Sequence, residues 1–277
     1  MITVLTIEKK PLSGTCRFFN KIAFNSLKVT CAKGAGADVR HLEYICRRKK
    51  VNWRRISRKA EQGRENLVYG GKDEIDADSG VSLFEPYELR QRLCGNMALE
   101  ILEIMKEIPK NLRIGIYDPK GDFSDLCECV LNFTSNFTVV THNKGLYTEQ
   151  AHRLLEEKGA VLCVCSKASA LSRCGLIIAP AVVGESFTPM TKAVMLTCAK
   201  PLVPLRCRVY YKYSFSLPRE FESLRPQSLQ AEMFGAALYS LEGIYQIGSC
   251  VPFVCTGSTD TQTTLSLQKY FSECFGT

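Results

Sequence analysis

The sequence predicts an α/β protein whose centre is a layered, parallel β-sheet. Two observations carry this prediction. From residue 112 onward, short apolar runs such as RIGIY and LIIAP alternate with stretches of about ten residues at helical spacing. These apolar runs lack the polar alternation of half-exposed strands, which indicates strands buried on both faces and joined by right-handed crossovers.

The composition sets the broad class. The chain has 277 residues, of which 45% are hydrophobic and 23% charged, so it can bury one large or two modest cores. No apolar stretch approaches the roughly 20 residues that span a bilayer, and the start MITVLTIEKK becomes charged too soon for a signal peptide. Fourteen cysteines without any CxxC suit a reducing compartment. We therefore expect a cytoplasmic protein with no membrane insertion.

Residues 1–80 are expected to form a small basic α/β region. The runs ITVLTI and SLKVTC predict two strands. Gly34 and Gly36 precede Asp38, a good N-cap, and the apolar residues from Val39 to Cys46 fall at helical spacing, which predicts a helix there. A second short helix is expected after Asn52, and the Gly- and Asp-rich segment that follows is predicted to be a linker or surface loop.

Residues 81–277 are expected to form the main domain. Pro86 opens an amphipathic helix that ends near Pro109. Next come the strand RIGIY, a helix from Asp122, the strand FTVVT, a helix over 148–158, the strand AVLCVC, a helical turn and the strand LIIAP. A C-terminal extension adds the strands AVMLTC, 207–215 and VPFVC, a helix after Pro226 and a terminal helix.

In this order of elements, residues 112–180 resemble the NAD(P)-binding domains of the shikimate dehydrogenase and glutamyl-tRNA reductase type. The resemblance implies a three-layer, Rossmann-like sheet that binds a dinucleotide at the carboxyl ends of its strands. The family's GxGxxG motif is degenerate here, because the run from Gly115 reads GIYDPKG and only Gly121 lies in the turn. Asp118, Asp122 and Asp125 also oppose a bound phosphate, with Lys120 alone to offset them.

The resemblance nevertheless implies a set of ligand-binding residues. Asp118, Lys120 and Gly121 would lie near the ligand. Thr141, Asn143 and Lys144 follow the second strand, where an NAD enzyme has an acid for the ribose, so the lysine implies NADP instead. A structural interpretation competes with this one, in which Asp118 shapes the turn and Asp122 caps the helix.

The same residues allow one further comparison. An Asp at the tip of a first strand, with Thr141 and Lys144 after the next, is similar to the haloacid dehalogenase-type phosphohydrolases. In that family Asp118 would be the nucleophile, but Lys120 stands where the second Asp belongs and AlaProAlaVal at 179–182 replaces an acidic pair. An active phosphatase is therefore not expected.

Two other patterns in the sequence are candidate binding sites. Eight cations occur among residues 47–59, and Arg47, Arg48, Arg54 and Arg55 are candidates to contact an acidic partner or nucleic acid, unless they form only a solvated face. Cys163 and Cys165 would share one face of a strand, but small buried side chains explain them better than a metal site.

Two functions remain open from the sequence. The first is binding of a nucleotide-type ligand at the carboxyl edge of the sheet, with an NADP-linked reductase as the enzyme this would imply. The second is a non-catalytic scaffold or regulatory protein that meets its partner through the basic N-terminal face. No residue can be assigned as catalytic, no metal site is expected, and whether the protein is an enzyme stays undecided.

Overall fold

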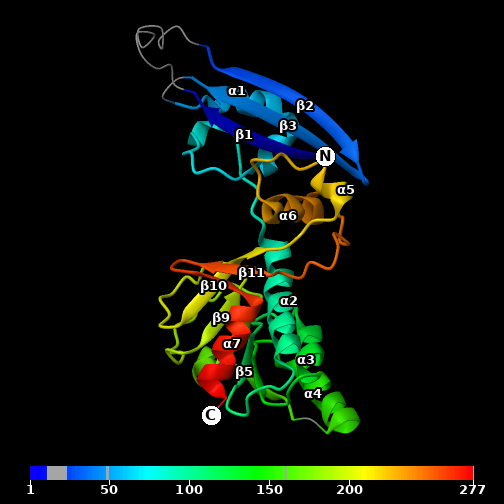
Figure 1. The fold of residues 1–277 in the computed structure, drawn as a ribbon, viewed down its shortest axis with the longest axis vertical. Coiled ribbons are helices and arrows are strands. Elements are labelled where there is room, and N and C mark those ends of the chain that lie inside the picture. The colour runs from blue at the N-terminus through cyan, green and yellow to red at the C-terminus, as the bar shows by residue number, and fades with distance from the viewer. Residues whose placement is uncertain (11–23, 48–49, 160, 277) are drawn as a thin grey trace. The chain divides into compact units, whose positions relative to one another are not determined.

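Figure 1 shows the computed structural model, which describes residues 1–10, 24–47, 50–159 and 161–276. The chain forms two compact units. Unit 1 contains Met1–Pro86 and Leu217–Ser249, and unit 2 contains Tyr87–Ser216 and Cys250–Thr277. The sequence-based division into residues 1–80 and 81–277 remains a prediction.

Unit 2 is built on an eight-stranded sheet with the order β12-β11-β10-β9-β8-β5-β6-β7. All neighbours from β10 to β7 are parallel, and β11 and β12 add an antiparallel edge. The six parallel strands are therefore arranged, in chain order, as 3-2-1-4-5-6, the order of dinucleotide-binding sheets. The predicted Rossmann-like α/β class is confirmed. The strands are β5 (Ile114–Tyr117), β6 (Phe137–Val140), β7 (Cys163–Cys165), β8 (Leu176–Ala179), β9 (Val194–Thr197), β10 (Arg208–Ser214), β11 (Val254–Gly257) and β12 (Thr261–Thr263).

Helices and loops cover the two faces of this sheet. Helix α2 (Tyr87–Met105) packs against β8, β9 and β10 and against α7 (Thr264–Phe275), while α3 (Ser124–Leu131) lies between α2 and α4 (Lys144–Lys158), as Figure 1 shows. A short 3₁₀ helix, η4 (Ala168–Arg173), packs against β5 and β6. The layers make the central strands inaccessible to water, which explains their continuous apolar sequences.

Gly115 shows why η4 can come so close to the sheet. A Cβ added at Gly115 would lie 2.6 Å from Leu171 Cδ2 and 3.0 Å from Cys174 Sγ. Only glycine leaves room there, so this residue of the GIYDPKG run serves the packing of η4 and not a phosphate.

Unit 1 is built on a four-stranded mixed sheet with the order β2-β3-β1-β4. Helix α1 covers one side, where its buried Trp53, Ile56 and Ala60 pack with Leu42 and Tyr44 of the sheet. Helix α6 packs against β1 and β4. The elements of unit 1 are β1 (Ile2–Lys9), β2 (Ser26–Gly34), β3 (Ala37–Cys46), α1 (Trp53–Ala60), η2 (Glu61–Asn66), β4 (Val68–Tyr69), η3 (Ala77–Ser79), α5 (Arg219–Glu222) and α6 (Ala231–Leu241).

The helix predicted after Asp38 is wrong, because this segment is strand β3. Ala35 and Gly36 both have positive φ, 49° and 79°, and form the two-residue turn of a β2–β3 hairpin. Both faces of β3 carry apolar side chains, and their combined spacing imitates a helix. The glycines therefore belong to the turn of a hairpin and do not precede a helix.

Candidate functional site

The turn between β5 and α3 already holds an anion, the side chain of Asp118. Its Oδ1 accepts hydrogen bonds from the backbone amides of Gly121 (3.0 Å) and Asp122 (3.1 Å), and its Oδ2 accepts one from Phe123 (2.9 Å). Asp118 is only 1% exposed. These amides are the donors that would face a pyrophosphate in a dinucleotide site, and here they are taken up internally.

Helix α3 begins two residues later than the sequence predicted. The sequence suggested Asp122 as N-cap, but the helix starts at Ser124 and its N-cap, Phe123, makes no side-chain capping bond. Asp122 is exposed. The interpretation that Asp118 shapes the turn is thus supported, while the assignment of the cap to Asp122 is wrong because helix α3 begins at Ser124 and Phe123 occupies the N-cap position.

A fourth hydrogen bond secures this carboxylate. The hydroxyl of Tyr147, in α4, donates to Asp118 Oδ2 at 2.7 Å. Tyr147 is fully buried, and burial raises the pKa of its hydroxyl, so it stays a donor at any physiological pH. A phosphate would have to displace the Asp118 side chain to take over these four donors.

The structure brings the other predicted ligand residues to the same carboxyl edge. Thr141 follows β6 and its Oγ1 accepts a hydrogen bond from the Asn143 amide at 3.1 Å. The Asn143 side chain donates to the carbonyl oxygen of Lys120 at 3.3 Å, and Lys144 begins α4 with an exposed side chain. The six residues are therefore neighbours in space. Their role in binding a ligand stays a prediction.

Sequence reasoning missed Glu185, which reaches this edge from the loop between β8 and β9. Its Oε1 lies 3.0 Å from His142 Nε2 and accepts a 3.4 Å hydrogen bond from the Tyr117 hydroxyl, and its Oε2 accepts one from the Ala168 amide. Burial and, after it, this carboxylate raise the pKa of Tyr117. Glu185 lies in a loop, 68 residues after its partner Tyr117, so no local sequence pattern predicts its role. It makes the edge more acidic.

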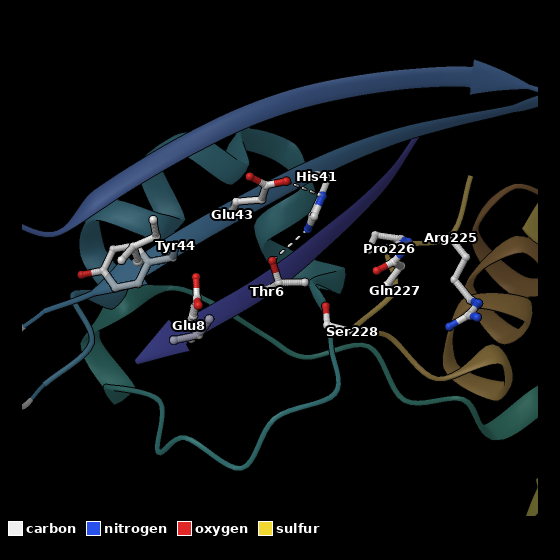
Figure 2. Close-up of a pocket in the computed structure, with 11 residues that line it drawn as sticks. Thr6, Glu8, His41, Glu43, Tyr44, Arg225, Pro226, Gln227 and Ser228 are labelled. Atoms are coloured by element: carbon white, nitrogen blue, oxygen red, sulfur yellow. Dashed lines mark hydrogen bonds and ion pairs between the residues drawn. The ribbon is translucent and has the colours of Figure 1, made fainter. Parts of the chain in front are cut away.

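A separate groove of about 630 Å³ lies in unit 1 (Figure 2), between the sheet and residues 225–228. The His41 ring sits between Thr6 and Glu43, with Nε2 2.9 Å from Thr6 Oγ1 and Nδ1 3.5 Å from Glu43 Oε1. Burial lowers the pKa of His41. This spatial series of a hydroxyl, an imidazole and a carboxylate is the arrangement of a nucleophile with its base. However, Thr6 lies inside strand β1, opposite Glu43 in the β1–β3 ladder, and not beside a helix N-terminus that would supply free amides for an oxyanion hole.

The basic residues of α1 point outward, as the interpretation of a basic face requires. Arg54, Arg55, Arg58 and Lys59 are exposed, while Trp53, Ile56 and Ala60 are buried. Arg47, just before α1, is exposed as well. Arg48, the remaining residue of the predicted contact set, lies outside the described residues.

Comparisons with known proteins provide little further information. No protein-family model matches the chain, and no curated protein matches it either. A solved structure that it resembles distantly is L-tryptophan dehydrogenase from Nostoc punctiforme, with a TM-score of 0.30 and 10% identity over 88% of this chain and 73% of that one. No argument about function rests on so loose a superposition, and the fold class follows from the strand order. Within the described residues, no helix is long and apolar enough to cross a membrane, and no cluster of three His, Cys, Asp or Glu side chains is suited to a metal.

Proposed function

We propose that this protein is a non-catalytic α/β protein that contacts the phosphate backbone of nucleic acid through the basic face of α1, defined as Arg54, Arg55, Arg58 and Lys59. The single observation that carries the proposal is the outward orientation of these four cations on two successive turns of one helix. Arginine offers a planar set of donors that matches phosphate oxygens, and closely spaced cations gain affinity by releasing counterions.

Two acids of unit 1, Glu61 and Asp73, are paired with other cations, which supports the proposal. Glu61 directly follows α1, but both of its carboxylate oxygens accept hydrogen bonds from Arg40. Asp73 is paired with Lys9 and accepts a hydrogen bond from Tyr69. Among the described residues, no ion pair involves Arg54, Arg58 or Lys59. Their charges therefore remain available to a partner.

Two exposed acids limit the expected strength. Asp76 and Asp78 lie at η3, which packs beside α1. Their charge offsets part of the attraction of the basic face for phosphate within a Debye length of about 10 Å. We therefore expect moderate affinity with a steep dependence on salt, and no preference for base sequence.

The assignment as non-catalytic rests on the carboxyl edge of unit 2. The amides of the β5–α3 turn are satisfied by Asp118, and Glu185 adds a second carboxylate nearby. A phosphate placed there would meet both negative charges, at a cost of about 1 kcal/mol for each exposed pair and more for a buried one. This geometry favours a retained scaffold over an active dinucleotide enzyme.

Fluorescence anisotropy with a labelled single-stranded RNA and a duplex DNA tests the proposal. The double variant Arg54→Glu and Arg58→Glu should bind at least about tenfold more weakly than the wild type at low salt, with a shallower salt dependence. Arg55 is left intact because it donates to the Asn25 carbonyl at 2.6 Å. A matched control, Lys110→Glu and Lys200→Glu, makes the same charge change on exposed residues of unit 2 and should leave binding unchanged. Equal binding by the two double variants would reject the basic face as the contact surface.

A second candidate function is binding of an NADP-like ligand at the carboxyl edge, through Lys120, Gly121, Thr141, Asn143 and Lys144 next to Asp118. The strand order of unit 2 favours it, because ligands of such sheets bind where the order reverses, between β5 and β8. A thermal-shift series with NADP, NAD, FAD and ATP distinguishes the two. A bound ligand at a hundredfold excess over Kd stabilises by about 2.7 kcal/mol. An increase in melting temperature with NADP that Lys144→Glu abolishes would favour this candidate. No increase with any of the four ligands would favour the non-catalytic scaffold.

A further inference from the structure

Strand β7 presents two cysteines to each other at the edge of the eight-stranded sheet. Cys163 and Cys165 are two residues apart on one strand, so their side chains project to the same face. Their Sγ atoms are 3.9 Å apart. Cys163 is exposed and Cys165 is partly exposed, whereas Cys174, the next cysteine in the sequence, is buried. The pair thus combines proximity with access from solvent.

The surroundings give the two thiols different roles. Cys163 is the more exposed thiol and can be reached by a small molecule. Burial raises the pKa of Cys165, with a further rise from Cys163 and an opposing effect of Lys144. Burial raises the pKa of Cys174 to about 12, so this third thiol stays protonated and does not compete.

We propose that Cys163 and Cys165 are a redox-active dithiol that forms an intrastrand disulfide by exchange with a small-molecule disulfide of the glutathione type. The Cys163 thiolate attacks one sulfur of that disulfide, and one small thiol leaves with the electron pair of the broken S–S bond. The Cys165 thiolate then attacks Cys163 Sγ and releases the second small thiol. The protein loses two protons and two electrons, and the small disulfide is reduced to two thiols.

Strand geometry makes this disulfide reversible. Two residues of a strand span about 6.6 Å, at the upper end of the Cα separations of about 4.4–6.8 Å that disulfides tolerate. The bond would therefore be strained, and strained exposed disulfides are readily reduced. Strand β7 lies at the edge of the sheet and pairs with β6, where Thr138 and Val140 are opposite the two cysteines. The backbone of an edge strand can therefore adjust to the disulfide more easily than that of a central strand. This inference does not depend on the proposed nucleic-acid contact.

Peptide mass spectrometry of the full-length protein tests the proposal. The protein is equilibrated in a series of glutathione redox buffers, quenched with acid, alkylated and digested with trypsin. The tryptic peptide 159–167 contains Cys163 and Cys165 and no other cysteine. In oxidising buffers we expect this peptide to lose two hydrogen atoms, and the loss should reverse in reducing buffers.

Three variants make the outcome decisive. Cys165→Ser should trap a glutathione adduct on Cys163, because the second thiol is missing. Cys31→Ser and Cys129→Ser remove exposed cysteines elsewhere and should leave the oxidised peptide unchanged. Stable glutathione adducts on both cysteines of the wild type, a disulfide between two copies of the chain, or no change in the peptide while Cys31 and Cys129 react would each overturn the proposal.

Discussion

The hydroxyl of Tyr147 donates a 2.7 Å hydrogen bond to the carboxylate of Asp118 and so connects α4 to the turn that precedes α3. These two residues belong to successive crossover units of the same sheet, β5–α3 and β6–α4. In a dinucleotide-binding protein, a bound phosphate would occupy the place of this carboxylate. Here a covalently attached anion does so, and the edge of the sheet is stabilised without a ligand.

Asp118→Asn should destabilise unit 2. The amide that replaces one carboxylate oxygen would direct N–H groups at backbone N–H donors, leaving one or two of them unsatisfied in a buried turn. We expect the free energy of unfolding to fall by about 2–4 kcal/mol, measured by urea denaturation. Asp122→Asn, at an exposed position of the same turn, is the control and should change it by less than about 0.5 kcal/mol. Equal effects of the two substitutions would contradict the role given to Asp118.

Tyr147→Phe tests the connection between the two crossover units. It keeps the buried ring and removes only the hydroxyl, so the carboxylate loses one of its four hydrogen bonds. The expected loss is about 1–2 kcal/mol, since hydrogen bonds to charged groups exceed the neutral ones. A double-mutant cycle with Asp118→Asn should show that the two losses do not add, because the residues are in direct contact. Strict additivity would mean that the Tyr147 hydroxyl contributes independently of Asp118 and would contradict this connection.

The sequence revealed the sheet of unit 2 because burial leaves a direct mark on composition. Strands β5, β6 and β8 read as continuous apolar runs, and all three are buried in the structure. It also located the carboxyl edge, because the polar residues after β5 and β6 meet wherever parallel strands end together. That Asp118 turns inward and accepts from three amides of this turn, while Asp122 stays exposed, could not be read from spacing alone.

Other features could not be predicted from the sequence, for physical reasons. Strand β3 carries apolar side chains on both of its faces, so their combined spacing matches the helical period. Glu185 acts at the edge through tertiary contacts with His142 and Tyr117, residues that are remote in sequence. The segment Leu217–Ser249 lies in unit 1 with the first 86 residues, which only long-range contacts reveal.

The stability of unit 1 should depend on pH through His41. Burial lowers the pKa of His41 in the folded protein, an effect that the neighbouring Glu43 opposes and Lys28 reinforces. A base with a depressed folded pKa binds protons more readily when unfolded, so its contribution is present above the unfolded pKa of about 6.5 and is lost as the pH falls below it. The stability advantage of the wild type over His41→Asn should therefore shrink between about pH 7.5 and about pH 5. His152→Asn, at an exposed position of α4, provides the control for the loss of a histidine outside unit 1.

Ala35→Asn should stabilise the β2–β3 hairpin. Ala35 has a φ of 49° and Gly36 a φ of 79°, as the two central residues of a turn that requires positive φ at both positions. Alanine is strained in this region, whereas Asn tolerates it, and Asn-Gly is the preferred pair for such turns. We expect the free energy of unfolding to rise by about 0.5–1 kcal/mol. Gly36→Ala should lower it, although no atom lies within 4 Å of the added Cβ, because the strain there comes from the backbone alone. Changes of opposite sign in the free energy of unfolding, measured by urea denaturation, would establish that Ala35 and Gly36 form a turn. Changes of the same sign would refute it.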